Sequence, residues 1–107
     1  MRVIARQTLR QFVVKLRGHK DQKAVESALD AWFYEVEQAD WKNPADVRKA
    51  YSSASIIGSD RVVFNIKGND YRLVVAINYH LQIVFIKWLG SHAQYDNVDV
   101  RTVQYGN

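Results

Sequence analysis

The chain has 107 residues, with 15 lysines and arginines against 11 aspartates and glutamates, and a formal net charge of +4. It contains no cysteine, which excludes a disulfide framework, a thiolate nucleophile and a cysteine-ligated zinc site. Hydrophobic residues make up 48% of the sequence and favour a single folded domain over residues 1–107. The excess of cations fits a polyanionic partner such as nucleic acid, and equally a solvated basic surface.

The N-terminal sequence MRVIARQTLR has no apolar stretch, so no signal peptide is expected. The longest apolar runs have the length of strands, too short to span a bilayer. We therefore expect a cytoplasmic protein that makes no contact with a membrane.

The first half of the chain is predicted to be mainly helical after a short opening strand at Arg2–Ala5. A helix is predicted to begin at Thr8, whose side chain would form a capping box with Gln11. Gly18 is a plausible end for this helix, because glycine tolerates the left-handed conformation that often follows a last turn.

A longer helix is predicted over Asp21–Ala39. Its apolar residues recur at helical spacing on one face: Val25, Leu29, Trp32, Val36 and Ala39. A third helix is predicted to start at Asn43-Pro44, because asparagine caps helices and proline suits the first helical position. The following Ser52–Ser59 is predicted to be a loop or an irregular strand.

The second half is predicted to form three antiparallel strands, at Arg61–Lys67, Tyr71–Asn78 and Ile83–Leu89, which are rich in β-branched and aromatic residues. Gly68-Asn69 predicts a two-residue hairpin turn between the first two. Helices followed by strands indicate an α+β domain, with the N-terminal helices packed on one face of a small antiparallel sheet.

The predicted turn also fixes which side chains share a face. The expected pairs are Lys67 with Asp70, Ile66 with Tyr71, Asn65 with Arg72, and Val63 with Val74. Alternation along the strands then places an apolar set under the helices: Val62, Phe64, Ile66, Leu73, Val75 and Ile77. The opposite face would carry Arg61, Asn65, Lys67 and Arg72. An RNA backbone could lie there, although one-sided antiparallel sheets routinely present polar residues to water.

The segment Lys87–Asp96, KWLGSHAQYD, contains the residues best suited to chemistry. Gly90 is expected to end the last strand, and His92 and Tyr95 to follow on a single turn. Metal-free RNA cleavage needs a group that transfers protons and cations that stabilise charge on phosphorus. Histidine exchanges protons near neutral pH. Five side chains are expected to converge at this end of the sheet: Lys67, Arg72, Lys87, His92 and Tyr95.

Other chemical motifs are missing from the sequence. There is no P-loop, no G-x-G-x-x-G and no H-E-x-x-H, and the three histidines fall in separate segments. We therefore assign no metal and no cofactor. The tryptophans are expected in the core or at its edge, although an exposed one could stack on a base: Trp32, Trp41 and Trp88.

Two motifs together resemble the HigB family of toxins. Val63–Val74, VFNIKGNDYRLV, is similar to the family pattern VFNIKGNxYRLV, and Gly90–Asp96, GSHAQYD, to the ending G-[ST]-H-x-x-Y-D. Ala31–Val47 resembles the corresponding family segment, so the resemblance extends from the first strand to about Val103. Val14–Lys23 departs from the family pattern.

The resemblance implies a fold like that of the RelE and ParE toxins, and a metal-independent endonuclease that cuts mRNA on translating ribosomes. It also implies a HigA-like antitoxin with a helix-turn-helix, through which alone the toxin would contact promoter DNA. The matched positions are Asn65, Lys67 and Arg72 in the hairpin motif and His92 and Tyr95 in the C-terminal motif. Lys87 stands where the family often has a basic residue on the last strand.

The leading hypothesis assigns catalysis to four residues, Arg72, Lys87, His92 and Tyr95, and RNA binding to three, Arg61, Asn65 and Lys67. Arg72 and Lys67 would hold the scissile phosphate and Lys87 would stabilise charge in the transition state. His92 would transfer the proton, and Tyr95 would orient or stack on a base. Two alternatives stay open: a ParE-like toxin that poisons gyrase, and a non-catalytic RNA- or ribosome-binding module.

Overall fold

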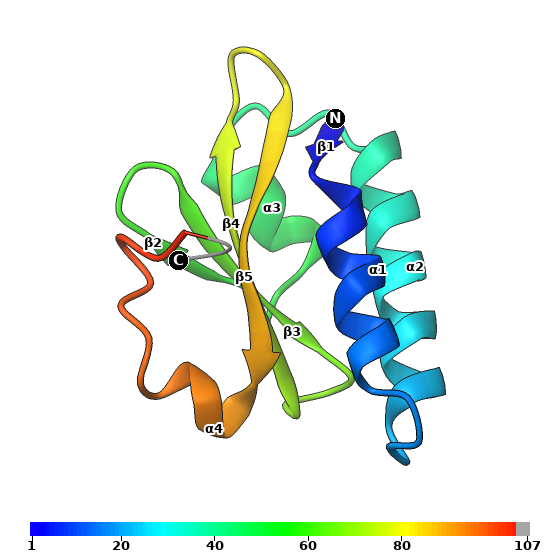
Figure 1. Ribbon diagram of the computed structural model, residues 1–107. Coiled ribbons are helices and arrows are strands. Elements are labelled where there is room, and N and C mark those ends of the chain that lie inside the picture. Colours follow the sequence, from blue (N-terminus) through cyan, green and yellow to red (C-terminus); the bar gives the residue numbers. More distant parts are fainter. Residues whose placement is uncertain (105–107) are drawn as a thin grey trace.

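A five-stranded sheet with helices on one face forms the body of the computed structural model, which describes residues 1–104 (Figure 1). The strands lie in the order β1-β5-β4-β3-β2. In chain order the elements are β1 (Arg2–Ile4), α1 (Arg6–Lys15), α2 (Gln22–Gln38), α3 (Pro44–Ala50), β2 (Ser55–Ile57), β3 (Arg61–Ile66), β4 (Tyr71–Asn78), β5 (Ile83–Ser91) and α4 (His92–Tyr95). The predicted α+β fold, with N-terminal helices on the sheet, is confirmed. No helix within residues 1–104 is long and apolar enough to cross a membrane.

The sheet is mixed, which corrects the prediction of a purely antiparallel one. β1 runs parallel to β5, pairing Arg2 with Ile83 and Ile4 with Phe85, while the other neighbours are antiparallel. Parallel neighbours need a long crossover connection, and the whole segment from α1 to β4 supplies it. β1 has only three residues, which are too few to show a pattern that fixes the direction of pairing. The parallel pairing at this edge of the sheet could therefore not be predicted from the sequence.

The central hairpin has the predicted register, with pairs Ile66–Tyr71, Asn65–Arg72 and Val63–Val74. The amide of Asp70 donates to the carbonyl of Lys67 across Gly68-Asn69 at 3.2 Å, so these two residues form the centre of the turn. Gly68 has a φ of 62°, the conformation for which glycine was expected there.

Helix starts agree with the sequence at two of three places. α2 begins and ends within one residue of its predicted bounds, and the Asn43 side chain caps α3 by accepting from the Asp46 amide at 3.0 Å. The predicted capping box of Thr8 is wrong. α1 already begins at Arg6, and the Thr8 hydroxyl donates to the carbonyl of Ala5 at 2.7 Å, because Thr8 lies inside the first turn.

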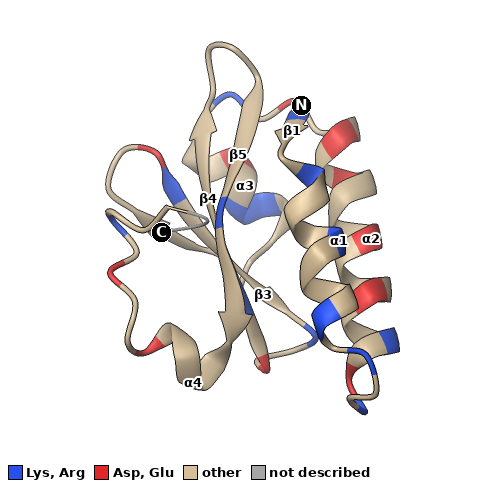
Figure 2. Ribbon diagram, in the orientation of Figure 1, with Lys and Arg blue, Asp and Glu red and all other residues tan. Residues whose placement is uncertain are grey.

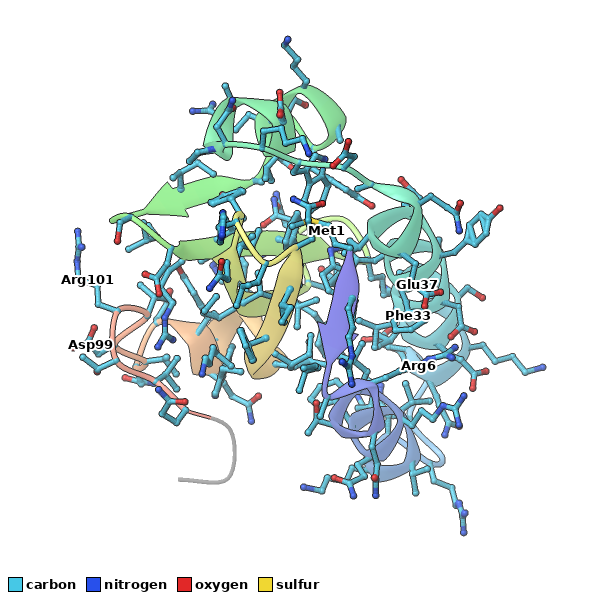
Figure 3. All side chains as sticks on the ribbon, turned by 90° about the horizontal axis from the view of Figure 1, so that it is seen from above. Met1, Arg6, Phe33, Glu37, Asp99 and Arg101 are labelled. Atoms are coloured by element: carbon cyan, nitrogen blue, oxygen red, sulfur yellow. The ribbon has the colours of Figure 1, made fainter. Side chains whose placement is uncertain are left out.

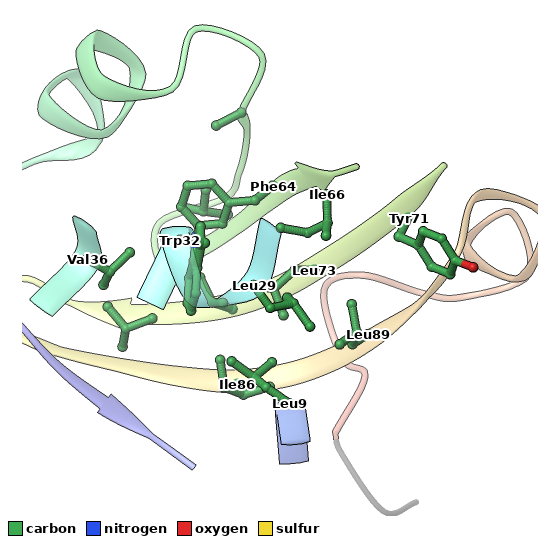
Figure 4. Packing of buried hydrophobic residues seen from close by; sticks show 14 of the residues in the cluster. Leu9, Leu29, Trp32, Val36, Phe64, Ile66, Tyr71, Leu73, Ile86 and Leu89 are labelled. Atoms are coloured by element: carbon green, nitrogen blue, oxygen red, sulfur yellow. The ribbon is translucent and has the colours of Figure 1, made fainter. Parts of the chain in front are cut away.

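The core lies between α1, α2 and the sheet, and the predicted inward set is buried (Figure 4). Phe64 on β3 is 1% exposed and is surrounded by aromatic rings. Its ring centroid lies 5.1 Å from that of Tyr51, 5.5 Å from Trp32 and 6.2 Å from Trp41. These contacts join α2 and α3 to the middle of the sheet, since each ring comes from a different segment.

The C-terminal segment, residues 97–104, covers the middle of the opposite face of the sheet; Asp99 and Arg101 mark this segment in Figure 3. Within the segment, the Asp99 side chain accepts a hydrogen bond from the backbone amide of Arg101. Val63 and Val74 point to this face and are 2% and 0% exposed. Arg61 is 7% exposed, and its Nη1 donates to the carbonyls of Val103 at 2.8 Å and Val100 at 3.4 Å. The expected open basic face is therefore largely a second packed layer.

We expect Phe64→Ala to lower the free energy of unfolding by about 3–5 kcal/mol, because it leaves a cavity between three other rings. Urea denaturation followed by circular dichroism measures the change. Tyr34→Ala is the matched control: Tyr34 is 63% exposed, and a loss below about 0.5 kcal/mol is expected there. Equal losses in the two variants would contradict the central place of Phe64.

Candidate functional site

The turn after β5 brings His92 back against the β3–β4 hairpin. Ser91 and Gln94 form a capping box, in which the Ser91 hydroxyl accepts from the Gln94 amide and the Gln94 side chain accepts from the Ser91 amide. The amide of His92 donates to the carbonyl of Asp70 at 2.8 Å. The start of the short helix α4 is therefore fixed at its N-cap, Ser91, and at its first residue, His92, and the predicted single turn carrying His92 and Tyr95 is confirmed.

Arg72 on β4 is the centre of the site. Its Nη1 donates to the carbonyls of Asn69 at 2.8 Å and Tyr71 at 3.3 Å, and its Nη2 lies 2.8 Å from Nδ1 of His92. A guanidinium can only donate, so Nδ1 must be the unprotonated nitrogen when this bond is made. The neutral ring then carries its proton on Nε2, and the exposed His92 presents a donor to solvent there.

Two aromatic rings lie beside this pair. Cζ of Arg72 is 5.8 Å from the ring centroid of Tyr95, which is 6.2 Å from that of Trp88. A Cβ atom at Gly90 would lie 2.5 Å from the Trp88 indole, so only glycine leaves room for the indole here. The prediction that Gly90 ends the last strand is therefore wrong. Gly90 lies within β5, opposite Arg72.

Trp88 was not among the candidate residues, although it is half-buried and contacts Tyr95. One signal in the sequence could have indicated it. Residues two apart on a strand share a face, so a glycine two positions after a tryptophan leaves space for the indole. With Trp88 included, the site combines a cation, an imidazole and two rings on which a nucleotide base could stack.

Lys67 was expected at this site but is directed elsewhere. Its Nζ lies 2.7 Å from Asp70 and 3.5 Å from Asp21, which precedes α2. The hydrogen bond to Asp70 raises the pKa of Lys67; burial opposes this effect, and the charges of Asp21 and Asp70 add to it. Tyr71 also donates to Asp21, at 3.1 Å. Lys67 therefore joins the hairpin to the start of α2, on the opposite side of the strands from Arg72.

The remaining candidates divide between the site and its surroundings. Asn65 pairs with Arg72 and donates to the Asn69 side chain at 3.1 Å, so it lies next to the site. Lys87 bonds Gln104 in the C-terminal segment at 2.9 Å. Arg61 is buried under the same segment. The structure thus unites Arg72, His92 and Tyr95, and leaves Arg61, Lys67 and Lys87 apart from them.

Charge alone does not locate the site, because basic and acidic residues are spread over the molecule (Figure 2). α1 contains three cationic side chains and no acidic residue, while most of the charged residues of α2 are acidic. Within residues 1–104 no three side chains of the metal-binding kind are grouped together. The arrangement of Arg72 and His92 can instead bind an anion, since both present N–H donors at an exposed surface.

Comparison with family models matches residues 25–98 to the family described as HigB_toxin, the RelE-like toxic component of a toxin–antitoxin system. The match covers more than half of the chain and includes both motifs of the site. Comparison with curated proteins gave no match.

The carboxylate of Asp21 generates a prediction about pH. Partial burial opposes its ionisation, but the hydrogen bond from Tyr71 and the charge of Lys67 outweigh this and lower its pKa below the ordinary 3.8. A carboxylate with a lowered pKa stabilises the fold above that ordinary value, and the contribution is lost as the pH falls through the folded-state pKa. We therefore expect Asp21→Asn to lower the melting temperature at pH 7, and the difference from the parent to vanish in acid below pH 3.8.

Thermal unfolding by circular dichroism from neutral to acidic pH measures this difference. Asp70→Asn is the control, because Asp70 also pairs with Lys67 but is 57% exposed at the turn and holds no residue of a helix. A smaller effect is expected for it. Identical melting temperatures of Asp21→Asn and the parent at pH 7 would contradict the proposed connection between the hairpin and α2.

Proposed function

The chain belongs to the HigB family, the RelE-like toxic components of toxin–antitoxin systems, and from this premise we propose that it is an endoribonuclease that cuts mRNA on the ribosome. The observation that supports this most is the contact between Arg72 and His92, which puts a permanent cation and a proton-transferring ring at one exposed point. Cleavage by the RNA's own 2′-hydroxyl needs these two groups and no metal.

The geometry suggests how substrate would activate the site. In the free protein the His92 Nδ1 is occupied by Arg72 and cannot take a proton. A phosphate oxygen is a stronger acceptor for a guanidinium than a neutral imidazole is. Binding of the scissile phosphate would therefore draw Arg72 away from His92 and leave Nδ1 free to act as a base.

The chemical step follows from that exchange. His92 would take the proton of the 2′-hydroxyl as its oxygen attacks phosphorus, and the imidazolium so formed would return a proton to the leaving 5′-oxygen. The products are a 2′,3′-cyclic phosphate and a 5′-hydroxyl end. Arg72 would stabilise the charge on the phosphoryl oxygens, and Tyr95 would orient or stack on a neighbouring base. Asn65, beside Arg72, would contact the RNA.

Family membership supports a proposal for the partners and the place of action. A toxin of this kind has an antitoxin partner. We propose a HigA-like protein with a helix-turn-helix, so that the toxin would reach promoter DNA only within the complex. The substrate would be mRNA on ribosomes, and the proposed place of action is the cytoplasm.

The test of the activity is codon-resolved primer extension on mRNA after induction. Cleavage is expected with the parent protein and is expected to fall at least about 100-fold with Arg72→Ala and with His92→Ala, which remove the cation and the proton-transfer group. Arg48→Ala and His19→Ala are matched controls, because both residues are exposed and lie outside the site. Each variant is first checked for an unchanged circular dichroism spectrum.

Other outcomes of the same induction separate the alternatives. Growth arrest with intact transcripts and altered plasmid supercoiling would replace the proposal by gyrase poisoning. Stalled ribosomes with intact transcripts would replace it by RNA or ribosome binding without cleavage. Full toxicity of both Arg72→Ala and His92→Ala would refute the assignment of the site.

The antitoxin proposal has its own test. We expect the gene adjacent to the toxin gene to encode a helix-turn-helix protein, and its co-expression to restore growth and to yield a stable complex in gel filtration. Binding of promoter DNA is expected for the complex and not for the toxin alone. Growth arrest that persists in the presence of that protein would contradict the proposal.

A further inference from the structure

A β-bulge at Lys87 interrupts the regular pairing of β5 with β4. Val74 pairs with Trp88 and Val75 with Ile86, so β5 has one residue more than β4 at this point, and that residue is Lys87. A bulge resets the alternation of side chains along the strand that contains it. It therefore changes which residues of β5 share a face.

The reset places Phe85 and Trp88 on one face of the sheet, although residues three apart on a regular strand point to opposite faces. Phe85 pairs with Ala76 and Trp88 with Val74, and both partners point away from α1 and α2. Lys87 joins them, since its Nζ lies 5.5 Å from the Phe85 ring and 2.9 Å from Oε1 of Gln104. A cation and two rings thus follow one another along β5.

An open hollow of about 650 Å³ lies at the Phe85 end of this row. The residues that line it include Asp60, Arg61, His80, Phe85, Lys87 and Gln104. Arg61 donates hydrogen bonds to two backbone carbonyls and has a structural role. No ion pair of Lys87 with a carboxylate occurs within residues 1–104, and its acceptor is a neutral amide.

We propose that this hollow is a second subsite for single-stranded RNA, in which Lys87 binds a backbone phosphate and Phe85 contacts a base. The inference rests on the proposed function, since it extends the path of the same substrate. A phosphate oxygen forms a charge-assisted bond with lysine that is stronger than the bond to Gln104 it would replace. The displaced amide carries no charge and can turn to solvent at the exposed Gln104.

The spacing fits a continuous strand of RNA. Gly90 lies opposite Arg72, and the bulged Lys87 lies between the levels of Val74 and Val75, so two to three residues of strand, about 7–10 Å, separate Lys87 from the level of Arg72. A stacked strand advances about 3.4 Å per nucleotide, so about two to three nucleotides separate the two cations. The rings of Tyr95 and Trp88 lie between them, 6.2 Å apart. Alternating cations and rings are what sequence-tolerant binding of single strands requires.

The experiment measures binding of 2′-O-methyl RNA, which cannot be cleaved, by fluorescence anisotropy at several salt concentrations. One probe is a single strand of about ten nucleotides, long enough for both subsites. The other is a dinucleotide, which can occupy only one. We expect Lys87→Gln to weaken binding of the long probe about tenfold and to reduce the slope of log K against log salt by about 0.7, the loss of one phosphate contact. Binding of the dinucleotide at Arg72 stays unchanged.

Three further variants make the result specific. Gln104→Glu keeps Lys87 but gives it a carboxylate partner. This variant is expected to weaken binding of the long probe as Lys87→Gln does. Phe85→Leu is expected to weaken binding of the long probe without changing the slope of log K against log salt, because the loss of stacking on a base changes no phosphate contact and so no counterion release. Lys49→Gln on α3 removes the same charge from an exposed position outside the hollow and is expected to change nothing.

The subsite is refuted if Lys87→Gln and Lys49→Gln give the same affinity and salt slope, or if the parent binds neither probe. Failure of the proposed function looks different. If the parent cuts no mRNA but binds the long probe through Lys87, the subsite stands and the endonuclease proposal falls. If the parent cuts mRNA while its long-probe binding is independent of Lys87, the endonuclease stands and the subsite falls.

Discussion

The register of β4 against β5 is the constraint on which the functional parts of this protein depend. It sets Arg72 opposite Gly90, where the lack of a side chain leaves room for the Trp88 indole. It brings the chain to Ser91 at the level of the hairpin turn, where α4 can bond the carbonyl of Asp70. A slip of one residue would turn Arg72 into the core and Leu73 outward. The large buried set on the helix side prevents such a slip, so the core specifies the site.

Local patterns in the sequence predicted the central part of this arrangement correctly. The turn at Gly68-Asn69 and the alternation beside it are short-range features, and they fixed the pairing of Asn65 with Arg72. The turn carrying His92 and Tyr95 was predicted from its spacing in the same way. The meeting of Arg72 with His92 followed from these two, because both segments end at the same edge of the sheet.

Features that depend on distant segments could not be predicted. The parallel pairing of β1 with β5 joins residues some eighty positions apart and has no local signal. Lys67 lies on the turn, but Asp21 from another element attracts it away from Arg72. Arg61 alternates correctly to the outer face and is then covered by carbonyls of the C-terminal segment. The predicted face is correct for Arg61 and wrong for Lys67, and in both cases a tertiary partner determines the role of the residue.

The two faces of the sheet show how a small domain can combine stability with an exposed reactive site. One face is largely apolar and is packed against helices. On the other, the C-terminal segment covers the apolar middle at Val63 and Val74 and leaves the polar ends of the strands exposed. Arg72 and His92 lie at one end, and each satisfies a hydrogen-bonding group of the other until an anion arrives. The site can therefore be stable in the free protein and still open to substrate, because the bond between them is one that a phosphate can replace.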